Sequence, residues 1–188
     1  MDALLASTGL VALAEIGDKT QLLSLLLAAR FRRPWPIIAG ILVATLANHA
    51  AASALGTWLT TLAGPEVLRW GLGLSFIAMA AWMLVPDKAE FGDTVGGRLG
   101  VFGTALVAFF LAEMGDKTQI ATIALAARFG EFMPVVLGTT AGMMLANIPA
   151  VLAGDRLAHR LPVRLVHAVA AGIFAAIGLA VMFGDAAG

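Results

Sequence analysis

The chain contains no cysteine and few charged residues, and each shortage limits what the protein can be. Without cysteine, neither a disulfide framework nor a thiolate metal site can form. Only 13% of the 188 residues are charged and 60% are hydrophobic, whereas soluble domains carry about 25% charged residues. Because no soluble fold of this size buries so much apolar surface, lipid must solvate much of the chain. The net charge of zero argues against nucleic acid as a partner.

The N-terminus lacks the positive charge with which secretory signal peptides begin, so we expect the first apolar segment to remain in the mature protein. Apolar runs close to the ~20 residues needed to cross a bilayer predict six membrane-spanning helices. They are expected at residues 4–29, 36–59, 67–85, 99–127, 133–152 and 164–183. The predicted fold class is therefore an all-α integral membrane protein.

A short polar connector at residues 86–98 divides the chain into residues 1–85 and 99–188, and these halves repeat one another. The motif Glu-Ile-Gly-Asp-Lys-Thr-Gln at residues 15–21 returns as Glu-Met-Gly-Asp-Lys-Thr-Gln at residues 113–119. Of the 17 positions that begin with each motif, 11 are identical at an offset of 98. Each half carries three predicted helices, an odd number, so we expect the halves in opposite orientations. This is the inverted repeat of many secondary transporters, whose binding site lies near the midplane.

Basic residues are distributed unevenly between the two sides of the predicted bundle. Eight follow predicted helices one, three and five, namely Arg30, Arg32, Arg33, Lys88, Arg98, Arg156, Arg160 and Arg164. The opposite side holds Arg69 and Arg128. The positive-inside rule then places the eight in the cytoplasm and both termini outside, in what we expect to be a bacterial inner membrane.

The repeated motif puts charges inside apolar runs, where a charge by default indicates a functional site. At 100° per residue, a continuous helix would bring Glu15, Asp18 and Lys19 onto one face, and Glu113 and Asp116 would share a face in the second copy. Facing each other across a pseudo-twofold axis, the four acids would form an oxygen-only metal site. Such sites suit hard cations such as Mn²⁺, Ca²⁺ and Mg²⁺.

Other residues of the two motifs are candidates for completing the site. Gly17 and Gly115 would allow either close helix approach or local unwinding that exposes backbone carbonyls as ligands. Polar residues near the acids are expected to support them or to couple them to transport. These are Lys19, Thr20, Gln21, Asn48, Lys117, Thr118, Gln119 and Asn147, with Ser24 and Thr122 further out.

A purely structural alternative is that each Glu pairs with the Lys four residues later, as Glu15 with Lys19, and only locks the helices together. This alternative gives no role to Asp18 and Asp116. The four carboxylates and two ammonium groups instead sum to −2, the charge that one divalent cation cancels. Because crowded carboxylates in a medium of low dielectric also attract protons, the sequence predicts exchange of a metal ion for protons.

With its doubled Glu-x-Gly-Asp-Lys-Thr, the chain resembles the Gdt-one family, also catalogued as uncharacterised protein family sixteen. The resemblance covers nearly the whole chain and implies cation–proton antiport that removes Mn²⁺ or Ca²⁺ from the cytoplasm. The likeness to bacterial manganese exporters favours Mn²⁺. The family's motif acids map onto Glu15, Asp18, Glu113 and Asp116, and its basic and hydroxyl positions onto Lys19, Thr20, Lys117 and Thr118. The connector is shorter and less acidic here than in many relatives.

Two other functions stay open at this point. An exporter of another small solute would need an organic-sized cavity rather than four converging acids. An intramembrane aspartyl protease could use Asp18 and Asp116, but it would carry Gly-x-Gly-Asp at one site and a different motif at the other. Here both sites read Glu-x-Gly-Asp, so we expect a transporter and not an enzyme. No cofactor is expected beyond the transported metal and protons, and the protein would work as a monomer or a homodimer.

Overall fold

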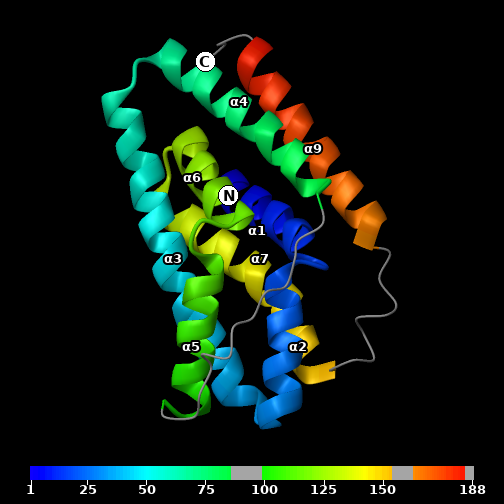
Figure 1. Ribbon diagram of the computed structural model, residues 1–188. Helices are drawn as coiled ribbons and strands as arrows, with labels where there is room; N and C mark the ends of the chain where they lie inside the picture. Colours follow the sequence, from blue (N-terminus) through cyan, green and yellow to red (C-terminus); the bar gives the residue numbers. More distant parts are fainter. Residues whose placement is uncertain (86–98, 154–162, 185–188) are drawn as a thin grey trace.

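The computed structural model describes residues 1–85, 99–153 and 163–184, and within these ranges the chain is helical with no strand (Figure 1). The helices are α1 (Asp2–Glu15), α2 (Lys19–Phe31), α3 (Pro34–Leu62), α4 (Pro65–Met83), α5 (Gly100–Glu113), α6 (Lys117–Phe129), α7 (Phe132–Ala153) and α9 (Val163–Phe183). The all-α prediction is confirmed for the part of the chain that the structure describes. The predicted connector at residues 86–98 lies outside that part.

Two of the predicted helices are each broken in two. The helix expected at residues 4–29 is α1 followed by α2, and the one expected at residues 99–127 is α5 followed by α6. Both breaks fall in the repeated motif, where Gly17 and Gly115 have φ angles of +83° and +74°. Glycine adopts these angles without the steric cost that a Cβ would bring. The prediction of continuous helices was therefore wrong at the motif. It rested on the length of the apolar runs, and so short a break hardly changes that length.

The other four predicted helices are confirmed to within a few residues. Pro34 and Pro65 begin α3 and α4, at positions where the missing N–H has no helical partner to lose. Gly130 ends α6 in the left-handed conformation, with its N–H donating to the carbonyl oxygen of Ala126 at 2.9 Å. These local signals explain why the ends of the helices could be read from the sequence.

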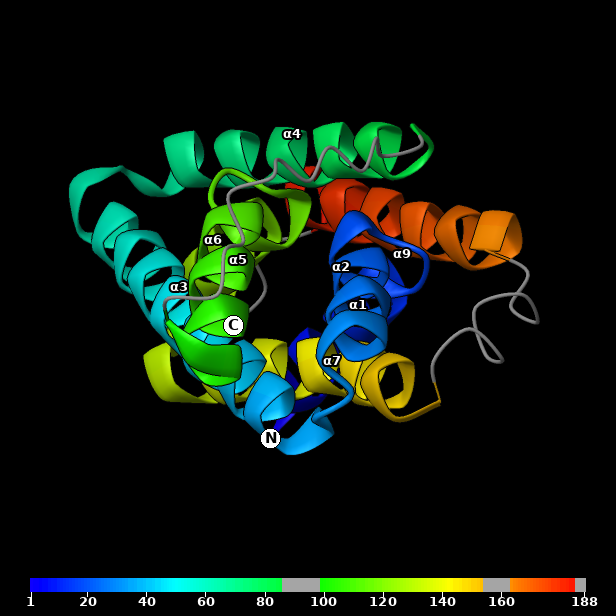
Figure 2. The ribbon, with the colours of Figure 1, turned by 60° about the horizontal axis from the view of Figure 1, so that its bottom comes forward.

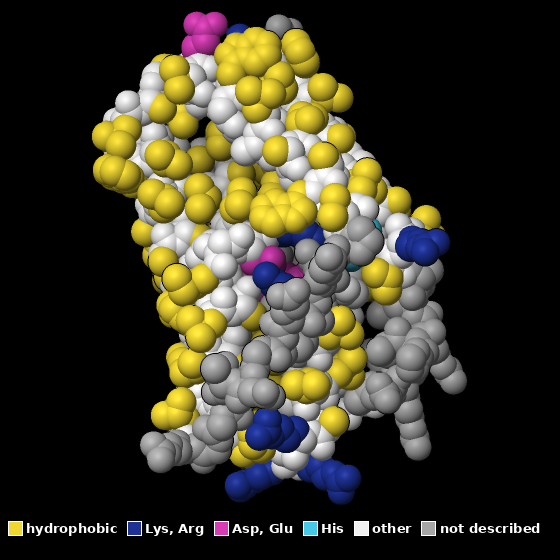
Figure 3. All heavy atoms as spheres, viewed as in Figure 1, with side chains coloured by type: hydrophobic (Ala, Val, Ile, Leu, Met, Phe, Trp, Pro, Cys, Tyr) yellow, Lys and Arg dark blue, Asp and Glu magenta, His cyan; other side chains and the backbone are white. Residues whose placement is uncertain are grey.

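Three of the described helices, α3, α7 and α9, are each long and apolar enough to cross a membrane. α5 is apolar but shorter. Hydrophobic side chains cover much of the face drawn in Figure 3, whereas basic side chains gather at its lower end. So large an apolar surface is that expected of a membrane protein.

The long helix of each half packs against the broken helices of the other half. α3 lies along α5 and α6, and α7 lies along α1 and α2. A Cβ on Gly40 of α3 would lie 2.7 Å from the carbonyl oxygen of Phe102, and one on Gly138 of α7 would lie 2.5 Å from that of Leu4. Gly40 and Gly138 match at the repeat offset of 98, and so do Leu4 and Phe102. The same close contact is therefore made twice.

α4 and α9 form a pair that covers the broken helices on one side, opposite α7 (Figure 2). Phe76 of α4 and Phe174 of α9 stack within this pair, with ring centroids 6.1 Å apart. One apolar cluster joins the pair to α1 and α6, and a second cluster joins α2, α3, α5 and α7. Because α1 and α6 belong to the first cluster and α2 and α5 to the second, both helix breaks fall between the two apolar clusters.

We expect Gly40→Val and Gly138→Val each to destabilise the protein by about 1–3 kcal/mol, the usual cost of forcing extra atoms into a packed core. Neither position has room even for a Cβ. The midpoint of thermal unfolding in detergent measures the effect. Gly172→Val is the matched control, because no atom lies within 4 Å of a Cβ at that position of α9. An equal loss of stability in the control would contradict the explanation.

Candidate metal centre

The two helix breaks have the same hydrogen bonds. The N–H of Gly17 donates to Oε1 of Gln21 at 2.8 Å, and the N–H of Gly115 donates to Oε1 of Gln119 at 2.7 Å. In each copy the aspartate then occupies the position just before the next helix, Asp18 before α2 and Asp116 before α6. A carboxylate is favoured there by the unpaired N–H groups and the partial positive charge of a helix start.

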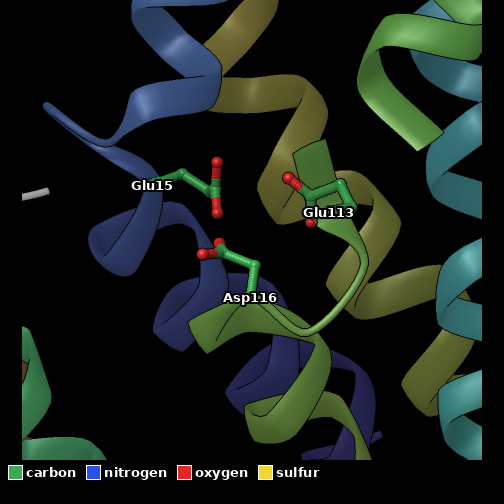
Figure 4. Close-up of side chains that lie close together, drawn as sticks. All are labelled: Glu15, Glu113 and Asp116. Atoms are coloured by element: carbon green, nitrogen blue, oxygen red, sulfur yellow. The ribbon is translucent and has the colours of Figure 1, made fainter. Parts of the chain in front are cut away.

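Three of the four predicted acids meet at these breaks. Glu15 ends α1, Glu113 ends α5 and Asp116 precedes α6, and each offers a carboxylate oxygen within 4.8 Å of the other two (Figure 4). Their exposed fractions are 0%, 0% and 3%. The site therefore combines residues from both halves of the chain, away from solvent.

Each of the three carboxylates has one oxygen in a polar contact and one without. Among the described residues, no hydrogen-bond partner reaches Oε1 of Glu15, Oε1 of Glu113 or Oδ2 of Asp116. The hydroxyl of Thr20 donates to Oε2 of Glu15, and that of Thr118 donates to Oε2 of Glu113 at 2.9 Å. Buried polar atoms are ordinarily satisfied, so three such carboxylate oxygens in one place are a candidate ligand set for a cation.

The ion pairs of the site connect one copy of the motif to the other. Nζ of Lys19 lies 2.7 Å from Oδ1 of Asp116, and Nζ of Lys117 lies 3.8 Å from Oδ1 of Asp18. The alternative of Glu–Lys pairs along a continuous helix does not hold for Glu15 and Lys19, because the first helix ends between them. Each lysine instead offsets an acid of the opposite half.

Asp18 is not one of the three converging acids. It is buried beside Lys117 and interacts electrostatically with Glu113. The predicted arrangement on shared helix faces was wrong, since it assumed an unbroken helix through the motif. Because each helix ends at the glutamate, the aspartate three residues later does not follow helical spacing. Asp116 is one of the three converging acids, whereas Asp18 is not.

The two predicted asparagines hold helices together. Asn48 of α3 donates from Nδ2 to the carbonyl oxygen of Phe110 in α5 at 3.1 Å. Asn147 of α7 accepts at Oδ1 from the hydroxyl of Ser24 in α2 at 2.6 Å. Nε2 of Gln21 also reaches α7, donating to the carbonyl oxygen of Ala146 at 3.2 Å. These contacts position the broken helices, and Oδ1 of Asn147 is already occupied by a donor.

The structure adds contacts that the sequence did not indicate. Nε2 of His167 in α9 lies 2.7 Å from the carbonyl oxygen of Ile16, and a Cβ on Gly17 would strike Val163 of the same helix. The second break is open by comparison, with nothing described within 4 Å of a Cβ on Gly115. No motif links α9 to the first break, because the contact spans some 150 positions of the chain. α9 thus covers one break and not the other.

On the face seen in Figure 3, acidic and basic side chains appear together among hydrophobic ones. The side chain of Lys19 is 25% exposed, whereas that of Lys117 is 2% exposed. Carboxylate ligands of a hard cation bind at about 2.2–2.5 Å and so lie up to about 5 Å apart. The observed spacing matches this requirement, and the arrangement can bind a divalent cation through oxygen alone.

Comparison with known proteins gives matches along nearly the whole chain. The family model described as "Divalent cation/proton antiporter GDT1" matches residues 3–91 and 101–188. A Vibrio cholerae protein named "Putative manganese exporter" is 50% identical over 184 residues, which are 97% of this chain and 92% of that protein. "GDT1-like protein 3" of Oryza sativa subsp. indica is 30% identical over 199 residues, 92% of this chain and 71% of that protein. No solved structure matches the chain.

Purified protein is expected to bind Mn²⁺, and Glu15→Gln, Glu113→Gln and Asp116→Asn are each expected to weaken binding at least about ten-fold, the loss that follows even from removing a group that supports a metal ligand. Calorimetric titration with MnCl₂ measures the Kd. Asp18→Asn should weaken Mn²⁺ binding less, because Asp18 lies outside the group of three acids. Glu131→Gln, a change of an exposed acid, is the control. Unchanged binding in all three carboxylate variants would rule out this centre.

Proposed function

The chain belongs to the GDT1 family of divalent cation/proton antiporters, and we propose that it exports Mn²⁺ from the cytoplasm in exchange for protons. The family is one of transporters and not of enzymes. The observation that carries the proposal is the meeting of Glu15, Glu113 and Asp116, each with a buried oxygen that no described residue hydrogen-bonds. Three such oxygens at one point are expensive to bury unless a cation or protons bind them.

The choice of metal follows from the ligands and from the relatives. Carboxylate oxygens are hard ligands that suit Mn²⁺ and Ca²⁺, whereas Zn²⁺ and copper favour the imidazole and thiolate groups that this centre lacks among its described residues. The relative from Vibrio cholerae is named for manganese. This name favours Mn²⁺ over Ca²⁺ as the exported ion.

We infer six membrane crossings in two inverted halves. α1 with α2, and α5 with α6, would each cross as one broken span, and α3, α4, α7 and α9 would each cross once. The matched contacts of Gly40 and Gly138 and the identical hydrogen bonds at the two breaks support a pseudo-twofold relation. Irregular backbone is tolerated at membrane depth where it lines a site inside the protein, and broken helices hold the ions of several inverted-repeat transporters.

The proposed orientation puts the end of α2 in the cytoplasm, since Arg30, Arg32 and Arg33 follow it. α2 and α5 then form the cytoplasmic half of the broken spans, and α1 and α6 the outer half. The α4–α9 pair packs on α1 and α6. The repeat relates these contacts to packing of α9 on α2 and of α4 on α5, and among the described residues that packing is slight at most. This supports a state closed toward the outside, from which export would begin by taking up a cytoplasmic ion.

The side chains around the centre suggest how the exchange proceeds. Thr20 and Thr118 each hold one oxygen of a glutamate and leave the other for a cation or a proton. Lys19 pairs with Asp116. We infer that an arriving cation displaces this ammonium group, and that protons on Glu15 and Glu113 replace the cation's charge when it leaves. Either occupant neutralises carboxylates that would otherwise repel each other.

In a bacterial strain that lacks its own manganese exporter, expression of this chain is expected to restore growth in excess Mn²⁺. Glu15→Gln, Glu113→Gln and Asp116→Asn should each reduce growth to that of cells with an empty vector, because each removes a ligand. Glu131→Gln should grow like the parent, with protein amounts compared by immunoblot. Full tolerance in the three carboxylate variants would leave only a structural role for the buried acids.

Proton exchange is tested in proteoliposomes that contain a dye quenched by Mn²⁺. Antiport moves protons out as Mn²⁺ moves in, so an acidic interior should accelerate uptake and an alkaline interior should slow it. An ionophore that collapses the gradient should bring both rates to the same value. Uptake that is indifferent to all three conditions would exclude proton coupling while leaving metal transport in place.

A further inference from the structure

Two arginines line one pocket whose described lining does not include the three converging carboxylates. Arg69 and Arg128 are the basic residues that the sequence places on the side opposite the basic loops. In the structure both line one pocket of about 530 Å³, formed by the start of α4, the end of α6 and the end of α9. Two guanidinium groups that face the same space repel each other unless an anion lies between them.

The described lining of the pocket has more positive than negative charge. It contains one acid, Glu66, whose carboxylate lies 3.8 Å from Arg69 and whose side chain is 82% exposed. So exposed a pair contributes little, and Nε of Arg69 is buried with no hydrogen-bond partner among the described residues. The start of α4, where no side chain caps the first turn, adds a partial positive charge. The pocket is thus short of an acceptor.

The remaining walls are apolar and lie where lipid head groups are expected. Ala180 and Val181 of α9 line the pocket opposite the arginines' helices. Trp70, next to Arg69, packs edge-on against Phe183, with centroids 6.0 Å apart. Tryptophan is enriched at the boundary between acyl chains and head groups. A ligand of this pocket would therefore have an anionic end and an apolar end.

We propose that this pocket binds the phosphate group of an anionic membrane phospholipid. Arg69 and Arg128 donate to the phosphate oxygens, since the guanidinium fork matches phosphate geometry. The acyl chain lies along Ala180 and Val181. Because the pocket draws on α4, α6 and α9, a bound lipid ties the α4–α9 pair to α6. The site is independent of the proposed cation exchange.

The test is a titration of the purified full-length protein in detergent with phosphatidylglycerol, phosphatidylcholine or inorganic phosphate, followed by the midpoint of thermal unfolding. Phosphatidylglycerol is expected to raise the midpoint saturably, and phosphatidylcholine to have little effect. Arg69→Gln with Arg128→Gln should weaken the response to phosphatidylglycerol about ten-fold, as expected for lost hydrogen bonds to a charged group. Arg30→Gln with Arg33→Gln, two exposed arginines at the other end, is the matched control.

The proposal is overturned if the double variant at Arg69 and Arg128 responds to phosphatidylglycerol as the parent does, or if the control pair loses the response equally. Inorganic phosphate that reproduces the whole effect would make this a site for a free anion and would also overturn it. Arg128→Gln alone, a change of an exposed side chain, serves if the double variant does not fold. Mn²⁺ binding measured on the same variants should be unchanged, which separates this site from the carboxylate centre.

Discussion

Charge buried away from water is the constraint on which this structure depends. A carboxylate in a medium of low dielectric costs several kcal/mol unless a partner offsets it, and here three carboxylates share one point. The chain meets this cost locally by ending α1 and α5 at the acids and starting α2 and α6 just after them, so that unpaired N–H groups lie nearby. It meets the rest by placing Lys19 of one motif against Asp116 of the other.

This cross-pairing makes the two halves depend on each other. Lys19 comes from the first half, while two of the three acids come from the second. The packing follows the same rule, because α3 lies on α5 and α6, and α7 lies on α1 and α2. Gly40 and Gly138 allow α3 and α7 to approach the backbone of the opposite half closely enough for this packing. Neither half could form the centre by itself.

The centre is nevertheless less symmetric than its motifs. Ser24 of the first half donates across to Asn147, whereas its counterpart Thr122 bonds to its own helix at Thr118. α9 covers the break at Gly17, whereas no described residue lies within 4 Å of a Cβ on Gly115. α4 and α9 form a single pair, and among the described residues this pair packs on α1 and α6.

The sequence alone determined the helical class, the ends of four helices and the identity of the buried acids. Apolar runs, prolines, glycines and charges at membrane depth each act on the structure locally, so their effects can be read from the sequence. It also pointed to Thr20 and Thr118 beside the acids. Only the tertiary structure decided which acids meet. The separation of Asp18 from the three converging acids and the approach of His167 to Ile16 depend on contacts between distant segments. Spacing along one helix carries no information about them.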